Sequence, residues 1–342
     1  MMKSRYLLTL PAVAFGLSLS ATNPATAMDK ATIAVPGVPP VFSTVFVYVA
    51  KEAGFYKKHG VDVRIKPFNS GVAAAKAVAT GKVDASLSPT APVSKIVSNA
   101  GIKMVGLMGL EKPDWFIGSM DPSKNKCEDL KGQAVGVDSP HGARWIQLAN
   151  MARKCKLRPD KHIPTVNLSS NVGSAMVAGR LTFGVLHRDD ITVIERESGK
   201  KLTIVSEIEK AAPGTHYLLF MTVKKNLAAK RDMYVRMVAA NIEAIRYMNN
   251  PANVDKVAKI AGVTKRKLMD AKAAVKDFVA YKYWPLDYDG LNAKRLAKTI
   301  KIQAIVGKKT KGKAGIKPGK KPVAVNELVD TSVYKDAMKL VK

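Results

Sequence analysis

Two arginines stand where an anionic group could be held. Arg144 lies in the first turn of an expected helix over residues 142–154, and Arg188 follows an expected strand over residues 183–186. A helix dipole favours an acidic side chain in the first turn, so an arginine there suggests a bound anion. The alternative for both residues is an arginine that simply faces solvent. We expect Arg144 and Arg188 to bind an anionic ligand.

Small residues recur at other points where a strand is followed by a helix. The backbone N–H groups at a helix start suit a carboxylate, sulfonate or phosphate, and side chains there could orient the same ligand. Capping of the helix is at least as good an interpretation for any single serine or threonine. The candidate ligand-binding residues at these points are Pro39, Val41, Ser70, Gly71, Ser88, Thr90, Ser139 and Asn171.

Histidine and aromatic side chains add further candidates. His141 and His187 could donate hydrogen bonds to a ligand or change charge with pH, or they could be capping or hinge residues. Tyr217 and Trp115 could cover a planar ligand. We include His141, His187 and Tyr217 among the expected ligand-binding residues.

The sequence lacks the common motifs of catalytic and metal sites. It has no GxSxG nucleophile motif, no GxxxxGK[ST] phosphate loop and no HExxH zinc motif. Its five histidines are scattered, and its two cysteines exclude a Cys-rich metal site. We therefore expect a binding protein rather than an enzyme, with no metal and no cofactor.

The elements that must position these residues alternate between strands and helices, which predicts an α/β fold. A first unit has strands over residues 31–35, 61–65 and 85–88, with helices over 43–53, 70–81 and 89–99. A second unit has strands over residues 133–137, 165–168 and 183–186, with helices over 142–154 and 172–178. Extended segments over 115–119 and 216–223 flank the second unit, and a long helical region over 227–248 follows. The second unit is thus expected to be inserted into the first, with ligands beyond the carboxyl ends of the strands.

The first 27 residues have the pattern of a cleavable signal peptide. Lys3 and Arg5 precede an apolar run over residues 6–21, and Ala25-Thr26-Ala27 supplies small residues for cleavage before Met28. The less favoured alternative is an uncleaved anchor. We expect the mature chain to be exported to the periplasm.

The chain is strongly basic. It has 56 Lys and Arg against 27 Asp and Glu, a formal charge of +29, and loss of residues 1–27 would leave +27. Such basicity would suggest nucleic acid, but an exported chain rarely meets it, so we expect no nucleic-acid partner. The dense run Lys308–Lys321 holds seven lysines and no acid. We interpret it as a solvated loop, and a solubilising surface is favoured over a polyanion site.

The two cysteines could be bonded to one another. Cys127 precedes the expected strand at residue 133, and Cys155 ends the helix that runs back beside it. Both should lie at the same end of one sheet in an oxidising compartment. A structural disulfide and two free buried thiols remain equally good alternatives.

Several segments taken together resemble one family. They are residues 46–62 (FVYVAKEAGFYKKHGVD), Ser70-Gly71, 81–85 (GKVDA), 129–132 (DLKG), 138–142 (DSPHG), 178–180 (AGR), 316–320 (IKPGK) and 328–332 (LVDTS). In these segments the chain resembles NMT1/THI5-like substrate-binding proteins, relatives of the nitrate, sulfonate and taurine binding proteins of ABC importers.

The resemblance implies a type II periplasmic-binding-protein fold. Residues 28–115 and 217–342 would form lobe 1 and residues 116–216 an inserted lobe 2. The two lobes would be joined by a hinge of two strands at residues 115–119 and 216–221, and would close on a ligand between them.

The resemblance also implies a function. The chain would be a monomeric periplasmic protein that captures a small, anionic organic ligand of the sulfonate or carboxylate class for the transmembrane subunits of an ABC permease. Alternatives are a binder of a neutral nitrogen heterocycle, such as a thiamine pyrimidine precursor, and an enzyme acting on such a metabolite. Thr182 replaces the acidic residue usual in the family, and His187-Arg188-Asp189 departs from its usual aromatic and proline, so ligand identity does not transfer.

Overall fold

The computed structural model describes Met1 and residues 28–341. The predicted signal peptide lies outside these residues apart from Met1. Among the helices of the described part, none is long and apolar enough to cross a membrane.

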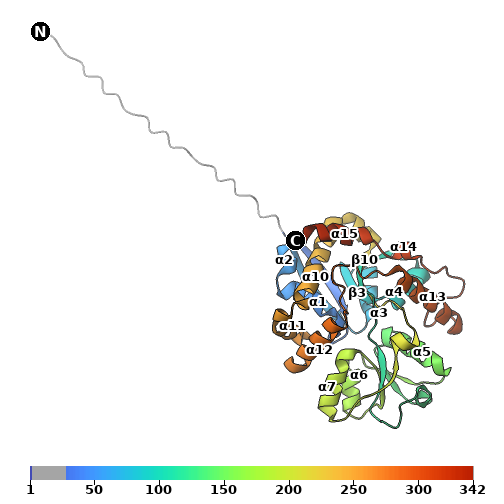
Figure 1. Cartoon of the computed structure of the whole chain (residues 1–342). Helices are drawn as coiled ribbons and strands as arrows, with labels where there is room; N and C mark the ends of the chain where they lie inside the picture. Colours follow the sequence, from blue (N-terminus) through green and yellow to red (C-terminus); the bar gives the residue numbers. More distant parts are fainter. Residues whose placement is uncertain (2–27, 342) are drawn as a thin grey trace.

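Two five-stranded sheets organise the molecule (Figure 1). The first has the order β2-β1-β3-β10-β4, in which β1 runs parallel to β2 and β3 while β10 runs antiparallel to β3 and β4. Its strands are β1 (Asp29–Pro36), β2 (Val61–Phe68), β3 (Ala85–Pro89), β4 (Met104–Leu110) and β10 (Leu218–Val223). The part built on this sheet is called lobe 1 below.

Helices on both faces cover the first sheet. They are α1 (Val45–Glu52), α2 (Phe55–Lys58), α3 (Gly71–Ala79), α4 (Thr90–Ala100), α9 (Lys224–Ala229), α10 (Arg231–Asn249), α11 (Val254–Ile260), α12 (Leu268–Ala280), α13 (Ala293–Lys309), α14 (Val325–Leu328) and α15 (Thr331–Leu340). The expected long helix over residues 227–248 is divided here into α9 and α10.

The second sheet has the order β7-β6-β8-β5-β9 and forms lobe 2. Its strands are β5 (Phe116–Ser119), β6 (Val135–Val137), β7 (Thr165–Asn167), β8 (Phe183–Leu186) and β9 (Thr203–Glu207). Its helices are α5 (Ala143–Ala152), α6 (Val172–Val177), α7 (Arg188–Ser198) and α8 (Ile208–Ala211). Strands β6, β7 and β8 are parallel, so their carboxyl ends meet at one edge.

The chain passes between the two sheets twice, through residues 111–115 and 208–217. The sequence predicted hinge strands at residues 115–119 and 216–221, but most of these residues belong to strands inside the two sheets. Strand β5 pairs along its whole length with β8 and β9, and β10 pairs with β3 and β4, because these buried apolar segments satisfy their backbone groups inside the sheets. The connections are the residues just before each strand.

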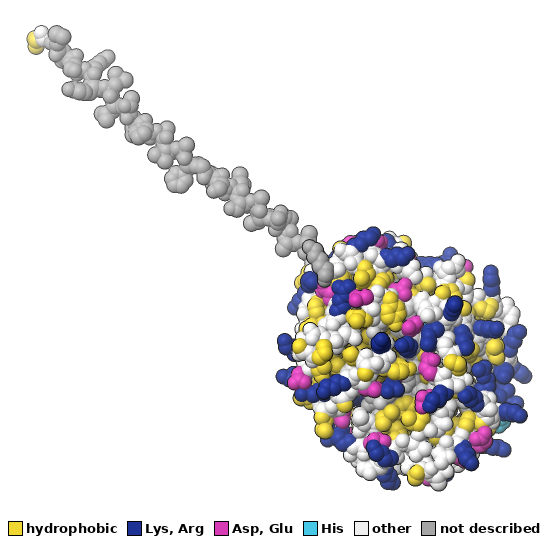
Figure 2. Space-filling view, viewed as in Figure 1, with side chains coloured by type: hydrophobic (Ala, Val, Ile, Leu, Met, Phe, Trp, Pro, Cys, Tyr) yellow, Lys and Arg dark blue, Asp and Glu magenta, His cyan; other side chains and the backbone are white. Residues whose placement is uncertain are grey.

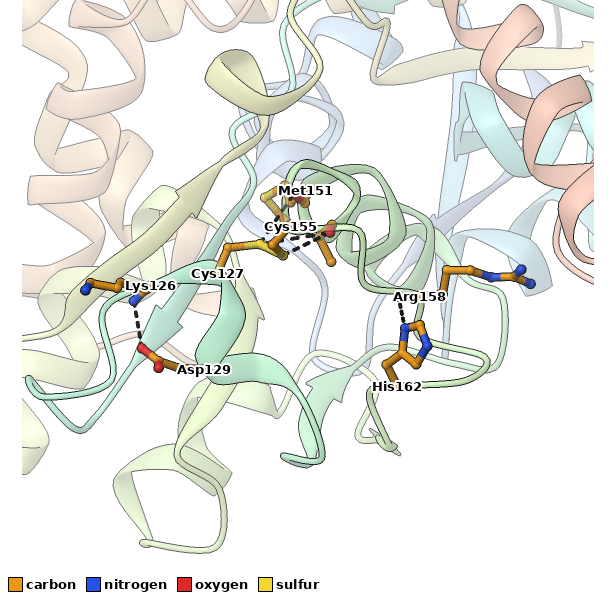
Figure 3. The surroundings of a disulfide bond; sticks show 8 residues. Lys126, Cys127, Asp129, Met151, Cys155, Arg158 and His162 are labelled. Atoms are coloured by element: carbon orange, nitrogen blue, oxygen red, sulfur yellow. Dashed lines mark hydrogen bonds between the residues drawn. A yellow bond between two sulfur atoms is a disulfide. The ribbon is translucent and has the colours of Figure 1, made fainter.

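The two cysteines are joined by a disulfide bond in lobe 2 (Figure 3). The S–S distance is 2.01 Å and the Cα–Cα distance is 5.9 Å. Cys127 begins the short 3-10 helix Cys127–Leu130, and Cys155 ends the 3-10 turn that follows α5. Of the two alternatives left open by the sequence, the structure has the bonded one.

Candidate functional site

A cavity lies between the lobes, at the carboxyl ends of the parallel strands. Lobe 1 lines it with residues around the start of α3, lobe 2 with residues before and within α5, and the two connections with Trp115 and Tyr217. Its volume is about 20 Å³, room for about one water molecule. Of the predicted ligand-binding residues, those that line it are Val41, Ser70, Gly71, Arg144, His187 and Tyr217.

Close packing shapes the lobe 1 wall of the cavity. Ser70 caps helix α3, because its Oγ accepts a hydrogen bond from the backbone N–H of Ala73 at 3.3 Å. A Cβ on Gly71 would lie 2.3 Å from Cδ of Pro89, so a larger residue cannot fit there without movement. The N–H groups of the first helical turn have no acceptor within the helix and lie beside the cavity.

In the lobe 2 wall, a carboxylate occupies the start of helix α5. Asp138 accepts hydrogen bonds from the backbone N–H groups of Ala143 at 3.1 Å and Arg144 at 3.0 Å. Burial raises the pKa of the Asp138 carboxyl, while the charge of Arg144 opposes the rise. Sequence reasoning did not select Asp138, although an acidic residue just before a helix is a common partner for its first turn.

Arg144 is almost fully buried, with 2% exposure. Its Nη1 donates a hydrogen bond to the carbonyl oxygen of Val185 and lies 3.7 Å from Oδ2 of Asp190. Its guanidinium carbon is 5.3 Å from the ring centroid of Trp115. The charge of Arg144 is thus partly compensated inside lobe 2, although the side chain lines the cavity.

His187 and Trp115 form a tilted aromatic pair beside a buried carboxylate. Nδ1 of His187 lies 2.8 Å from Oδ1 of Asp114, which also accepts a hydrogen bond from the hydroxyl of Tyr283 at 3.0 Å. The rings of His187 and Trp115 are 3.7 Å apart, and Tyr217 meets the Trp115 ring edge-on at 5.6 Å. Asp114 thereby fixes the orientation of the imidazole.

Two ring nitrogens of this pair are unsatisfied. Among the described residues, Nε1 of Trp115 and Nε2 of His187 are buried and have no hydrogen-bond partner. Both side chains line the cavity and are 3% exposed. Because an indole N–H can only donate, the Trp115 side chain needs an acceptor that the described residues do not supply.

Arg188 lies elsewhere, in a contact between the lobes. Its Nε and Nη2 each donate to a carboxylate oxygen of Asp277 at 2.9 Å, and its guanidinium stacks over Tyr281 at 4.7 Å. The hydrogen bonds that Arg188 donates to the Asp277 carboxylate raise the pKa of Arg188. Arg188 is not among the residues that line the central cavity. Its bidentate partner is a carboxylate of lobe 1, which sequence reasoning could not locate.

Three further ion pairs join α7 to lobe 1 beside Arg188. Arg196 pairs with Asp270 at 2.6 Å, and Arg266 pairs with Asp189 and, at 2.7 Å, with Asp190. Together with the Arg188–Asp277 pair they form a bridge from α7 to α12 and to Arg266, which lies just before α12. This bridge holds the lobes together on one side of the cavity.

The remaining predicted residues are engaged with the protein itself. Ser88 lies 3.1 Å from the Ser86 hydroxyl, and Thr90 lies 2.7 Å from Nδ1 of His216. His216 also contacts the carbonyl of Gly290, and burial lowers the pKa of its imidazole to about 4.

Three other predicted residues lie at the rim, where the lobes touch. The carbonyl of Pro39 accepts a hydrogen bond from the Ser170 hydroxyl at 2.7 Å, and the Asn171 amide lies 3.5 Å from the carbonyl of Val38. The His141 ring packs edge-on against a tryptophan, and burial together with nearby lysine charges lowers its pKa.

Ser139 is buried beside the start of α5. Its hydroxyl has no partner among the described residues and lies where a Cβ on Gly142 would clash, at 2.2 Å. It does not line the central cavity.

Comparison with known proteins identifies the family of the chain. The NMT1/THI5 like family model matches residues 42–254. A comparison with curated protein sequences gave no match.

Solved structures share the fold over almost the whole chain. A Bordetella bronchiseptica RB50 protein is 18% identical with a TM-score of 0.74, covering 92% of this chain and 98% of its own. The periplasmic nitrate-binding protein NrtA of Synechocystis PCC 6803 is 15% identical with a TM-score of 0.67, covering 92% and 89%. The periplasmic aliphatic sulphonate binding protein SsuA of Escherichia coli is 15% identical with a TM-score of 0.65, covering 90% and 99%.

These likenesses confirm the predicted fold class, two α/β lobes of the periplasmic-binding-protein kind. Because the family model covers more than half of the chain, the resemblance inferred from the sequence is confirmed as well. The chain belongs to the NMT1/THI5-like family.

Proposed function

We propose that the chain is a periplasmic solute-binding protein that captures a small organic ligand with a carboxylate or sulfonate group and delivers it to an ABC permease. The observation that carries this proposal is the pair of buried, unsatisfied ring nitrogens of Trp115 and His187 at the cavity between the lobes. An anionic oxygen there would accept a hydrogen bond from the indole N–H of Trp115.

The anionic group would also meet the start of helix α3. Gly71 brings backbone N–H groups to the cavity, and the helix dipole favours negative charge at this end. In this proposal Arg144 lends positive potential from the opposite wall, while Arg188 acts in lobe closure instead of ligand contact.

Binding requires the lobes to move apart. The cavity of about 20 Å³ is far smaller than a typical ligand pocket, which is of order several hundred Å³. At its rim, hydroxyls of Ser169 and Ser170 donate to carbonyls of Asn69 at 2.8 Å and Pro39 at 2.7 Å. Solute would enter when these contacts open, and a ligand that binds the closed form better would shift the population toward it.

A second candidate ligand is a neutral nitrogen heterocycle. The aromatic set of Trp115, Tyr217 and His187 could stack a planar ring. Asp138, whose pKa burial raises, could accept or donate a hydrogen bond at a ring nitrogen or amino group.

A binding screen with matched variants tests the proposal. We expect thermal shift and calorimetry on sulfonates, carboxylates and pyrimidines to find a solute that binds stoichiometrically and is not turned over. Trp115→Phe leaves a smaller aromatic ring without the N–H, so it should weaken binding about 10-fold or more, the value of a buried hydrogen bond to an anion. Trp145→Phe is the matched control, because Trp145 is also a buried tryptophan but lines a different cavity.

Equal affinity of Trp115→Phe and Trp145→Phe for every solute found would contradict the proposed site. Turnover of a bound metabolite by the purified protein would favour the enzyme alternative. Tighter binding of uncharged pyrimidines than of sulfonates and carboxylates would select the second candidate.

A further inference from the structure

One surface of lobe 1 is almost purely basic. Between Gly290 and Asn326 the chain contains ten lysines and one arginine, and no aspartate or glutamate. These lysines lie on helix α13 and on the segment that follows it, and all ten are exposed. They are called the lysine surface below: Lys294, Lys298, Lys301, Lys308, Lys309, Lys311, Lys313, Lys317, Lys320 and Lys321.

The segment after α13 is folded onto the protein. The backbone N–H of Lys317 donates to the side chain of Asn99 at 2.8 Å, and that of Val323 donates to the hydroxyl of Ser98 at 3.0 Å. Ala314 and Ile316 of this segment are buried. The lysine run expected to be a solvated loop is therefore the end of a helix and a docked segment that present their charges on one face.

The charges of this surface are not neutralised. Within the described residues, none of the ten lysines lies within 4.0 Å of a carboxylate oxygen. The neighbouring Lys95 donates to the carbonyl of Lys313, and its pKa is lowered by burial and by the charges of Lys76 and Lys317. Lysines from three elements are thus close enough to repel one another.

Basic charge is concentrated in lobe 1. Residues 28–115 and 217–342 carry 39 Lys and Arg against 16 Asp and Glu, a net +23. Residues 116–216 carry 15 against 11, a net +4. In Figures 1 and 2, lysine and arginine side chains crowd the edge of the molecule at which α13 lies.

The composition of the surface favours a diffuse anionic partner. Protein interfaces are enriched in arginine and aromatic residues and depleted in lysine. Residues 290–326 hold one arginine and no Phe, Tyr or Trp. Lysine is a hydrated point charge on a flexible stem, which suits many loosely placed phosphates on a flat surface better than a shaped protein site.

We propose that the lysine surface binds the anionic phospholipid headgroups of a membrane and so holds the protein at a bilayer. The attraction is electrostatic, adds up over several lysines and weakens as salt screens it. It does not depend on which solute the cavity accepts, and it operates without solute.

Vesicle co-sedimentation of the mature chain tests this proposal. We expect binding to vesicles that contain phosphatidylglycerol, little binding to pure phosphatidylcholine, and loss of binding with added salt. A variant of the lysine surface should partition at least about tenfold more weakly, since each lysine near an anionic surface contributes to binding. The variant carries four substitutions: Lys301→Gln, Lys308→Gln, Lys309→Gln and Lys320→Gln.

A control variant removes the same number of charges from exposed lysines on α1, α2 and α11, across lobe 1 from α13 (Figure 1). It carries Lys51→Gln, Lys57→Gln, Lys256→Gln and Lys259→Gln, and it should bind vesicles nearly as well as the parent. Equal loss in both variants would show that only net charge matters and would overturn the proposal. Equal binding to neutral vesicles, or preference for soluble polyglutamate over anionic vesicles, would also overturn it.

Discussion

Removal of Arg266 should open the lobes. Arg266 is 17% exposed and lies against Asp189 and Asp190, whose side chains are 1% and 8% exposed. Loss of one partner of a buried ion pair costs about 3–5 kcal/mol, because the remaining charge stays out of water. The loss destabilises the closed form only, because Asp189 would be exposed to water once α7 separates from lobe 1. At about 1.4 kcal/mol per factor of ten, 3 kcal/mol is about a 150-fold shift toward the open form.

The same change at Arg188 should have a smaller effect. The side chains of Arg188 and Asp277 are 38% and 43% exposed. Exposed ion pairs contribute about 0.2–1 kcal/mol. Arg188→Met should therefore shift the lobe equilibrium less than about fivefold. Arg246→Met is the control, because its partner Asp287 also lies in lobe 1.

Small-angle X-ray scattering of the solute-free variants measures the opening. We expect a larger radius of gyration for Arg266→Met, a small change for Arg188→Met and none for Arg246→Met, with native circular dichroism in all three. Scattering from folded Arg266→Met that matches the parent would refute the reasoning. A larger opening in Arg188→Met than in Arg266→Met would refute it as well.

Three further predictions concern stability. Replacement of Cys127 and Cys155 by serine frees a loop of 28 residues and should lower the free energy of unfolding by about 3–4 kcal/mol, measured by denaturant titration under oxidising conditions; an unchanged midpoint would contradict a bonded pair. Burial lowers the pKa of His216 to about 4, below its usual 6.5, so the unfolded chain binds more protons between these values. The free energy of unfolding, compared with that of His216→Gln, should keep its full value above pH 6.5 and fall by about 3 kcal/mol as the pH drops to 4. A difference between the two proteins that does not change with pH would contradict this. Gly71→Ala should cost about 1–3 kcal/mol, because the new Cβ meets Pro89, and unchanged thermal unfolding would show that the contact relaxes freely.

The alternating pattern was sufficient to predict most of the sheet strands. Residues 61–65, for example, follow a glycine and alternate apolar and polar side chains, and the structure has β2 there. Strand β4 was not predicted. All seven of its residues are buried, so the sequence has no alternation of apolar and polar residues that would indicate a strand. Gly106 and Gly109 lie where Leu219 and the carbonyl of Leu218 approach the strand closely.

The candidate site was predicted in part, for a similar reason. Junctions between strands and helices are local features, so Ser70, Gly71 and Arg144 could be placed near the cavity from the sequence. The pairing of Arg188 with Asp277 joins residues 89 positions apart in different lobes, and no local pattern signals it. Asp114 was not predicted as a site residue, because its role depends on a histidine 73 positions later.

The indole N–H of Trp115 tests the central claim most directly. The chain has three tryptophans, so a proton–nitrogen NMR spectrum should show three indole signals, assigned with Trp115→Phe and Trp145→Phe. Titration with a solute found by the binding screen should move the Trp115 signal downfield, as a new hydrogen bond forms. The signal of Trp284, which already donates to the carbonyl of Ser43 at 3.2 Å, should move little. A Trp115 signal that stays in place at saturation would contradict a ligand held by this side chain between the lobes.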